Sequence, residues 1–185
     1  SSAASDVYKR QANAYDKERD VRTNIAGEFQ KSNLAAALQT AELICGRLDE
    51  DKIYEALSQI RISGRMEEIA PGIIVDVSHN IQGMQGFVQT VEANYHGMKK
   101  RILFAASHQN EEEYMKNILK TIPEIEAFYT VGIHKRRIDE AEFQDAFRKM
   151  IDRNQETTVC FVVGSFYLAG MAKEFINQEE ENVRL

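Results

Sequence analysis

From Gly64 onward, short apolar runs alternate with amphipathic stretches, and no other feature of the sequence constrains the fold as strongly. The apolar runs are nearly continuous and rich in β-branched and aromatic residues, and they occupy positions 73–75, 102–106, 127–131 and 159–163. Such runs are typical of strands that are covered on both faces. Stretches with helical spacing follow the runs, at 82–95, 111–121, 139–153 and 165–177. This order predicts an α/β fold, a doubly wound and mainly parallel sheet with helices on both faces.

The sequence before Gly64 follows a different pattern. From Ser32 to Ile44 apolar residues recur at helical spacing, and a second, shorter helix is predicted over 53–60. Residues 1–22 mix charged residues, Ala and Ser without an apolar period, so we expect a disordered tail or a non-native junction there. We therefore divide the chain into that tail, a helical segment over 23–61, an α/β domain over 62–178 and a frayed acidic tail over 179–185.

The net charge of −6 argues against a nucleic-acid partner, because the chain has no excess of positive charge to attract a polyanion. The cationic run at 134–137 is interpreted either as a solvated turn or as a polyanion site. No apolar stretch approaches the roughly 20 residues that a membrane helix needs. Cys45 and Cys160 lie far apart in apolar sequence and predict neither a disulfide nor a zinc site. We expect a cytoplasmic monomer without a membrane partner.

Polar residues directly follow the first of these strands, at the position where ligands gather in open α/β sheets. Asp76, Ser78, His79 and Asn80 come after the run at 73–75 and before a predicted helix. A carboxylate at Asp76 can accept hydrogen bonds from ribose hydroxyls, and an imidazole at His79 can face phosphate or orient the carboxylate. The alternative is structural, because Asp, Ser and Asn at a strand end are also ordinary helix caps. The spacing alone leaves both interpretations open.

Two further strand ends and one upstream arginine are candidates of the same kind. Gly164 and Ser165 follow the last apolar run, and Ser165 either caps a helix or hydrogen-bonds a ligand carboxylate. The polar stretch at 107–110 follows the second run and is either part of a site or a capped helix start. Arg65, ahead of a short strand expected at 66–69, suits phosphate, base stacking or a surface ion pair. The sequence has no glycine-rich phosphate loop with its lysine and no cysteine pairs at metal spacing, so no metal ligand is assigned.

Four blocks, taken in order along the chain, resemble the folylpolyglutamate synthase branch of the Mur ligases. They are residues 27–33 with the Ala-rich helix behind them, residues 63–67, residues 75–80 and residues 163–170. The Asp-x-Ser-His-Asn and Gly-Ser-x-Tyr-Leu blocks are the most specific, and the resemblance spans 27–177. It implies that the α/β domain is a Rossmann-like Mur ligase C-terminal domain and that residues 23–61 are the last helices of a central ATPase domain.

The resemblance implies an enzyme that uses ATP and Mg²⁺ to convert a folate carboxylate to an acyl phosphate, which the amine of glutamate then attacks. In that family ATP lies between the central P-loop domain and the C-terminal domain. The residues that match nucleotide contacts by position are Gln30, Asn33, Arg65, Asp76 and His79, with the first two on the adenine side. His79 is also the candidate catalytic residue. Ser165 matches a residue near the incoming amino acid.

The sequence also departs from the family pattern. The Asp-Lys-Asp block expected after the second strand is replaced by residues 108–111, which supply no lysine. The P-loop, the metal ligands and most of the folate surface belong to the central domain in the family. We therefore expect Mg²⁺ to be bound mainly outside these residues and the chain alone not to turn over. The alternative is a non-catalytic, degenerate α/β module that binds a nucleotide or an interaction partner, and the acceptor, dihydropteroate or a reduced folate, stays open.

Overall fold

The computed structural model of the chain describes residues 6–10, 19–23, 28–134, 137–151 and 157–184. The chain divides into two compact units, residues 1–63 and residues 64–185. The sequence predicted a domain boundary between residues 61 and 62. The second unit holds most of the α/β domain expected over 62–178.

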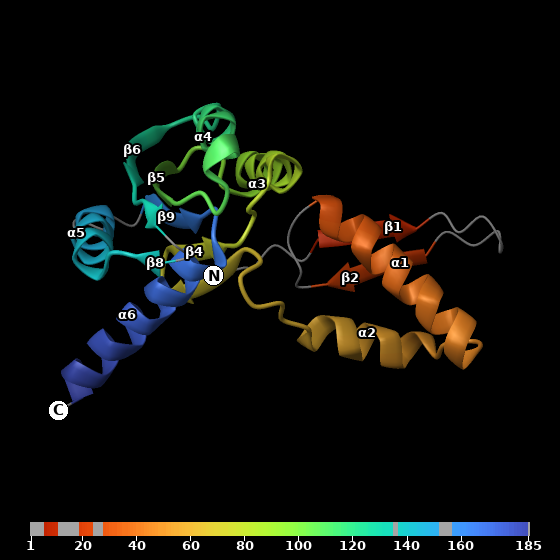
Figure 1. Cartoon of the computed structure of the whole chain (residues 1–185). Helices are drawn as coiled ribbons and strands as arrows, with labels where there is room; N and C mark the ends of the chain where they lie inside the picture. The colour runs from red at the N-terminus through yellow and green to blue at the C-terminus, as the bar shows by residue number, and fades with distance from the viewer. Residues whose placement is uncertain (1–5, 11–18, 24–27, 135–136, 152–156, 185) are drawn as a thin grey trace. The chain divides into compact units, whose positions relative to one another are not determined.

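The second unit is built on a five-stranded sheet (Figure 1). The strands lie in the order β3 (Glu67–Ala70), β4 (Ile73–Asp76), β9 (Thr158–Val163), β5 (Lys99–Phe104) and β6 (Ile125–Thr130). β4, β9, β5 and β6 are parallel to one another, whereas β3 pairs antiparallel with β4 through a tight turn at Gly72. A mainly parallel sheet was predicted from the apolar runs, and the prediction is confirmed.

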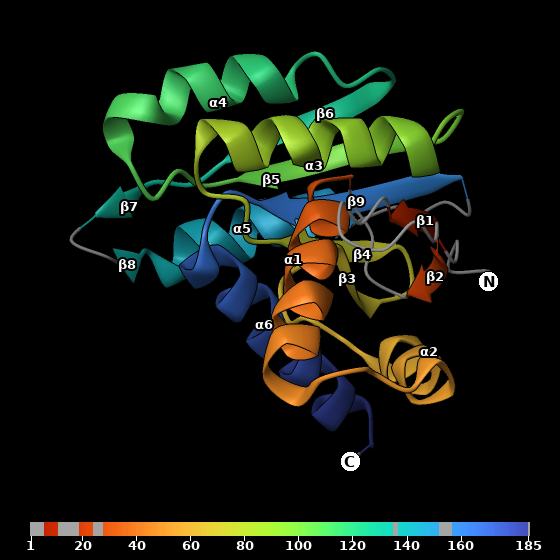
Figure 2. The ribbon, with the colours of Figure 1, turned by 90° about the vertical axis from the view of Figure 1, so that its right-hand side faces the viewer.

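Helices cover both faces of this sheet, as Figure 2 shows. One face carries α3 (Ile81–Asn94) and α4 (Glu112–Leu119), the latter preceded by the short helix η1 (Gln109–Glu111). The opposite face carries α5 (Glu140–Ile151) and α6 (Phe166–Arg184). Successive strand side chains point to opposite faces, so the central strands bury apolar residues on both sides. This burial is the reason why the runs in the sequence are continuous rather than alternating.

The core consists of two clusters, one on each face of the sheet. Ile74, Ile102 and Phe161 pack under α3 and α4, whereas Val75 and Val162 pack against α5 and α6. Burial of aliphatic and aromatic side chains of this kind contributes about 1.5–3 kcal/mol per residue. The core therefore holds the carboxyl ends of the strands in fixed register. A short antiparallel pair, β7 (Ile133–His134) and β8 (Arg137–Ile138), follows β6.

The last helix is longer than the sequence predicted. We expected a helix over 165–177 and a frayed tail over 179–185, but α6 continues to Arg184. Side chains one turn apart interact along this extension, since Gln178 Nε2 donates to Glu174 Oε1 at 3.4 Å. Glu179 also lies 3.8 Å from a guanidinium nitrogen of Arg148 on α5. These contacts between side chains help to extend the helix beyond its apolar period.

The first unit contains α1 (Glu28–Cys45) and α2 (Glu50–Gln59), close to the two helices predicted there. Leu34 and Leu57 form its small buried core. Asp49 caps α2 by accepting from the amide of Asp51 at 3.0 Å. α1 ends before Gly46, which has a φ of +77°.

Part of the segment predicted to be a tail is in strands. β1 (Asp6–Arg10) pairs antiparallel with β2 (Arg19–Thr23). Such a pair is held by hydrogen bonds between backbone groups, so it needs no apolar period in the sequence. The rest of residues 1–22 lies outside the described residues. Across the described ranges, no helix combines the length and the apolar character needed to cross a membrane.

Candidate functional site

The carboxyl ends of β4 and β9 form a topological switch point. The two strands are parallel neighbours, and Asp76 at the end of β4 lies opposite Val163 at the end of β9. The chain leaves β4 toward α3 on one face of the sheet, and it leaves β9 toward α6 on the other face. The two strands therefore lead to helices on opposite faces of the sheet, and ligands bind at such positions in folds of this class.

Asp76 anchors this edge. The residue is only 4% exposed, and each carboxylate oxygen accepts a backbone hydrogen bond. Oδ1 accepts from the Ser78 amide at 2.8 Å, and Oδ2 accepts from the Met66 amide at 3.0 Å. Burial raises the pKa of Asp76 above its usual range, whereas the hydrogen bonds from Ser78 and Met66 and the charge of Arg65 oppose part of that shift. The carboxylate thus ties the segment before β3 to the loop after β4.

Arg65 lies beside Asp76, and a contact of the two residues with a nucleotide stays a prediction. Its Nη1 is 4.0 Å from Asp76 Oδ1. The turn that carries Arg65 is held by Gly64, whose carbonyl accepts from the Val77 amide at 2.8 Å. Gly64 has a φ of +72°, and a Cβ there would come within 2.7 Å of Val77 Cγ1. A glycine is therefore required for the close approach of the two loops.

A second set of contacts braces the same turn from α6. The Gly64 amide donates to Glu67 Oε2 at 2.5 Å, and Lys173 Nζ lies 2.6 Å from that oxygen. Glu67 and Lys173 are 106 residues apart in the sequence. No local pattern in the sequence signals this pair.

His79 is the third residue of the loop after β4, which begins at Val77. Its Nδ1 is 3.0 Å from the Val77 carbonyl oxygen. Because a carbonyl only accepts, Nδ1 carries the proton, and in the neutral ring Nε2 is left as the acceptor. The imidazole also packs against the ring of Phe166, with centroids 5.6 Å apart. Asn80, the next residue, caps α3 by accepting from the Gly83 amide at 2.7 Å.

Gly164 allows the loop after β9 to approach its neighbours. It has a φ of +108°, and a Cβ there would lie 2.5 Å from the Ala105 carbonyl oxygen and 2.6 Å from the Phe104 ring. Its amide is 3.4 Å from the Asp76 carbonyl oxygen, and its own carbonyl accepts from Ser107 Oγ at 3.5 Å. The loops after β4, β5 and β9 are thus in contact at one edge of the sheet.

Ser165 is completely buried and caps α6. Its Oγ accepts from the Tyr167 amide at 3.1 Å, and its carbonyl accepts from the Ala169 amide at 3.1 Å. This is the structural alternative that the sequence left open for Ser165. A contact between Ser165 and an amino-acid substrate stays a prediction.

The remaining predicted residues lie elsewhere. Gln30 and Asn33 belong to the first unit, one turn apart on α1, where Asn33 Nδ2 donates to Gln30 Oε1 at 3.1 Å. Their adenine-side role stays a prediction. His108 precedes η1 without a side-chain cap, and it is exposed. Phe166 was not among the residues predicted from the sequence. Its position directly after the Gly164–Ser165 turn is the signal that could have identified it.

The described residues do not form a metal site by themselves. Over these ranges no group of three or more His, Cys, Asp or Glu side chains is placed to hold a metal ion. The Asp76 carboxylate, at the centre of the edge, already accepts from two backbone amides. The described donor set therefore does not fit a resident Mg²⁺.

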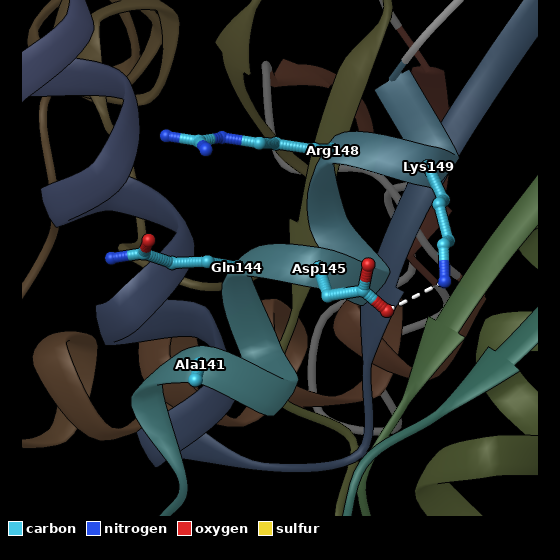
Figure 3. A pocket seen from close by; sticks show the side chains of 5 residues that line it. All are labelled: Ala141, Gln144, Asp145, Arg148 and Lys149. Atoms are coloured by element: carbon cyan, nitrogen blue, oxygen red, sulfur yellow. Dashed lines mark hydrogen bonds and ion pairs between the residues drawn. The ribbon is translucent and has the colours of Figure 1, made fainter.

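One hollow lies along α5 (Figure 3). It has a volume of about 410 Å³ and is lined by Ala141, Gln144, Asp145, Arg148 and Lys149. Its charged groups are engaged within the chain, because Lys149 Nζ lies 2.6 Å from Asp145 Oδ2 and Arg148 lies over the Phe175 ring. We therefore assign no ligand to this hollow.

Comparison with known proteins gives a curated relative and solved structures of similar fold. No known protein-family model matches the sequence. The curated dihydrofolate synthase/folylpolyglutamate synthase of Bacillus subtilis (strain 168) is 22% identical over 121 residues, which are 62% of this chain and 27% of that protein. The chain therefore spans about a quarter of the length of this curated relative.

Solved structures extend the likeness to most of the chain. A point mutant of the L. casei FPGS superposes with a TM-score of 0.70 at 19% identity, covering 92% of this chain and 44% of that one. E. coli FolC in complex with ADP has a TM-score of 0.69 at 17% identity, covering 80% and 40%. A pseudomurein peptide ligase type C from Methanothermus fervidus has a TM-score of 0.70 at 18% identity, covering 94% and 40%. The chain thus has the fold of a folylpolyglutamate-synthase-type Mur ligase, as the resemblance predicted, and spans less than half of each of these structures.

Proposed function

We propose that this chain is the C-terminal part of an ATP-dependent folylpolyglutamate or dihydrofolate synthase. The complete enzyme would join glutamate to a folate carboxylate through an acyl phosphate, and the second unit would supply one wall of its nucleotide site. The observation that carries the proposal is the meeting of Arg65, Asp76 and the His79 loop at the switch point. The fold supports it, because E. coli FolC, which shares the fold, has been solved with ADP.

Each of the three residues has a distinct role in this proposal. The guanidinium of Arg65 is partly exposed and permanently charged, which suits a phosphate oxygen. Asp76 holds the Arg65 turn, and the lone pairs that its oxygens retain can accept from ribose hydroxyls. His79 offers Nε2 to a hydroxyl or a phosphate, since Nδ1 is directed to the Val77 carbonyl. Gln30 and Asn33 would contribute on the adenine side, and Ser165 would support the loop near the incoming glutamate.

We also propose that this chain does not catalyse the ligation alone. Formation of an acyl phosphate from ATP requires groups that cradle the phosphates and a metal that neutralises their charge. We propose that Mg²⁺ is bound mainly by residues outside the described ones and that the 185 residues do not turn over by themselves. A site with one wall leaves much of a nucleotide hydrated, so ATP is expected to bind weakly.

The experiment is a titration of the 185-residue chain with ATP, followed by NMR. We expect Arg65→Ala and His79→Ala to weaken binding, whereas His96→Ala, an exposed histidine after α3, serves as the matched control and leaves it unchanged. A P-loop domain of a folylpolyglutamate synthase added in trans is expected to tighten binding. Equal ATP affinity of all three variants and the wild-type chain would contradict the proposed site.

A non-catalytic nucleotide-binding or interaction module remains the second candidate. Two observations favour it: residues 108–111 supply no lysine, and the Ser165 hydroxyl caps α6. The trans experiment separates the candidates. Ligase activity with ATP, glutamate and a folate after addition of the P-loop domain supports the synthase, whereas nucleotide binding without any such activity supports the module.

A further inference from the structure

Phe166 is exposed at the start of α6, where core packing does not account for it. It is the first residue of that helix, and it is 60% exposed. The residues of α6 that face the sheet are Leu168, Ala169, Ala172 and Phe175. Phe166 therefore gains little from the hydrophobic core, although it is a large apolar side chain.

The ring of Phe166 instead packs on His79. The two ring centroids are 5.6 Å apart and the planes are inclined by 47°. The contact joins the loop after β4 to the loop after β9, which are the two sides of the switch point. Ser165 Oγ accepts a capping hydrogen bond from the Tyr167 amide, which fixes the first turn of α6. The cap therefore helps to keep the Phe166 ring in contact with His79.

The imidazole is thus restrained in two ways. The Val77 carbonyl selects the tautomer by accepting from Nδ1 at 3.0 Å, but one hydrogen bond still permits the ring to tilt about that atom. The Phe166 ring limits this tilt on one side. Together they restrict the directions in which Nε2 can point.

We infer that Phe166 is a positioning residue, which holds the His79 imidazole so that Nε2 is presented at the open edge between β4 and β9. That the ligand of Nε2 is a nucleotide rests on the proposed function. The orientation of His79 does not, because both restraints belong to the chain without any ligand.

The test compares Phe166→Leu with Phe166→Tyr and with Tyr167→Leu in the full chain. Leu removes the aromatic ring but keeps an apolar side chain, whereas Tyr restores the ring. Tyr167 is the matched control, because it is also exposed on α6 but points about 100° away around the helix. NMR of the imidazole nitrogens, at a pH where the ring is neutral, reports the tautomer and the orientation of His79 without ligand.

We expect the wild-type chain, Phe166→Tyr and Tyr167→Leu to show His79 as one tautomer with Nδ1 protonated. Phe166→Leu is expected to shift and broaden the His79 ring signals, because the ring can then tilt about Nδ1, while the Val77 carbonyl still selects the tautomer and the amide spectrum of the core strands stays unchanged. Unchanged His79 signals in Phe166→Leu would overturn the inference, even if ATP bound more weakly, because Phe166 would then act on the nucleotide itself.

The second readout is ATP affinity by NMR titration. Aromatic pairs contribute about 0.5–1.5 kcal/mol, so Phe166→Leu is expected to weaken ATP binding by about 2- to 10-fold. The affinity of Phe166→Tyr is expected to stay within about twofold of the wild type. A shifted His79 spectrum with unchanged ATP affinity would support the positioning of His79 by Phe166 and overturn the assignment of the nucleotide as the ligand of Nε2. If the wild-type chain bound no ATP, the proposed function would fail while the ligand-free spectra still decided the positioning role.

Discussion

The backbone amide of Met66 donates a 3.0 Å hydrogen bond to Oδ2 of Asp76, across ten residues of sequence. Met66 has a φ of 45°, in the left-handed region where a non-glycine residue is strained. The bond therefore stabilises a conformation that the local sequence disfavours. It also places the neighbouring Arg65 beside the same carboxylate. Arg65, Met66 and Asp76 thus form one structural unit, and its stability is measurable apart from any activity.

Asp76→Asn is expected to destabilise the chain by about 1 to 3 kcal/mol. An amide side chain has one acceptor oxygen, so it cannot accept from both the Met66 and the Ser78 amide. Urea unfolding followed by circular dichroism measures the change. Asp145→Asn is the control, because Asp145 is exposed and pairs only across one turn of α5. A loss no larger than that of the control would show that the two amides do not depend on the carboxylate.

The contribution of Asp76 to stability is expected to depend on pH in the opposite sense to that of most carboxylates. Its pKa in the folded chain is raised above the usual value of 3.8, mainly by burial. The contribution is therefore fully present below the unfolded pKa and is lost as the pH rises through the folded pKa. Unfolding free energies of the wild type and Asp76→Asn, measured between about pH 3 and pH 7, should differ less as the pH rises. A difference that grew with pH would mean that the folded pKa is lowered.

Gly164→Ala is expected to cost about 2 to 4 kcal/mol, because strain at positive φ adds to a steric overlap. The new Cβ would meet the Ala105 carbonyl oxygen at 2.5 Å, which is backbone and cannot swing aside. The matched control is Gly170→Ala on α6, where nothing lies within 4 Å of a Cβ. That change should stabilise the helix by about 0.5–1 kcal/mol. Thermal unfolding of both variants makes the comparison, and similar midpoints for the two would refute the steric argument.

Lys100→Met is expected to be nearly neutral or stabilising, within about 1 kcal/mol, although Lys100 is paired with Glu124 at 2.9 Å. The Lys100 side chain is fully buried, so replacing its charge by an apolar group of similar length removes a desolvation penalty. Glu124→Gln should be the more destabilising change, because it leaves the ammonium group buried without its partner charge. Chemical unfolding of both variants gives the order. A large loss in Lys100→Met alone would show that the ion pair stabilises more than its burial costs.

The contribution of Glu124 to stability is expected to depend on pH in the opposite sense to that of Asp76. The hydrogen bond from Lys100 lowers the pKa of Glu124 below its usual value of 4.5. Its contribution is therefore present above that value and lost as the pH falls through the lowered pKa. In Lys100→Met the carboxyl group of Glu124 should titrate closer to its usual pKa, which a carbon-13 NMR titration of its side chain measures. An unchanged titration would exclude Lys100 as the cause.

The sequence predicted the elements whose signal is local. Continuous apolar runs predicted the four parallel strands, and helical spacing predicted α3 to α6, because burial on one or two faces is encoded in residues that are near in sequence. The prediction was poorer where charge is buried. The strand expected at 102–106 begins at Lys99, since Lys100 and Arg101 are buried through pairing with Glu124 and Glu126. Nothing near Lys100 in the sequence indicates that pairing.

The sequence by itself determined which residues follow each strand, and therefore that Asp76, His79 and Ser165 lie at the carboxyl edge of a parallel sheet. Only the tertiary structure decided what those residues touch. It brought Met66 to Asp76, Phe166 to His79 and Lys173 to Glu67, across separations that no periodicity spans. The reason is that the order of strands in the sheet, β4 beside β9, is set by how the whole core packs. Two strand ends that are far apart in the sequence become neighbours only through that packing.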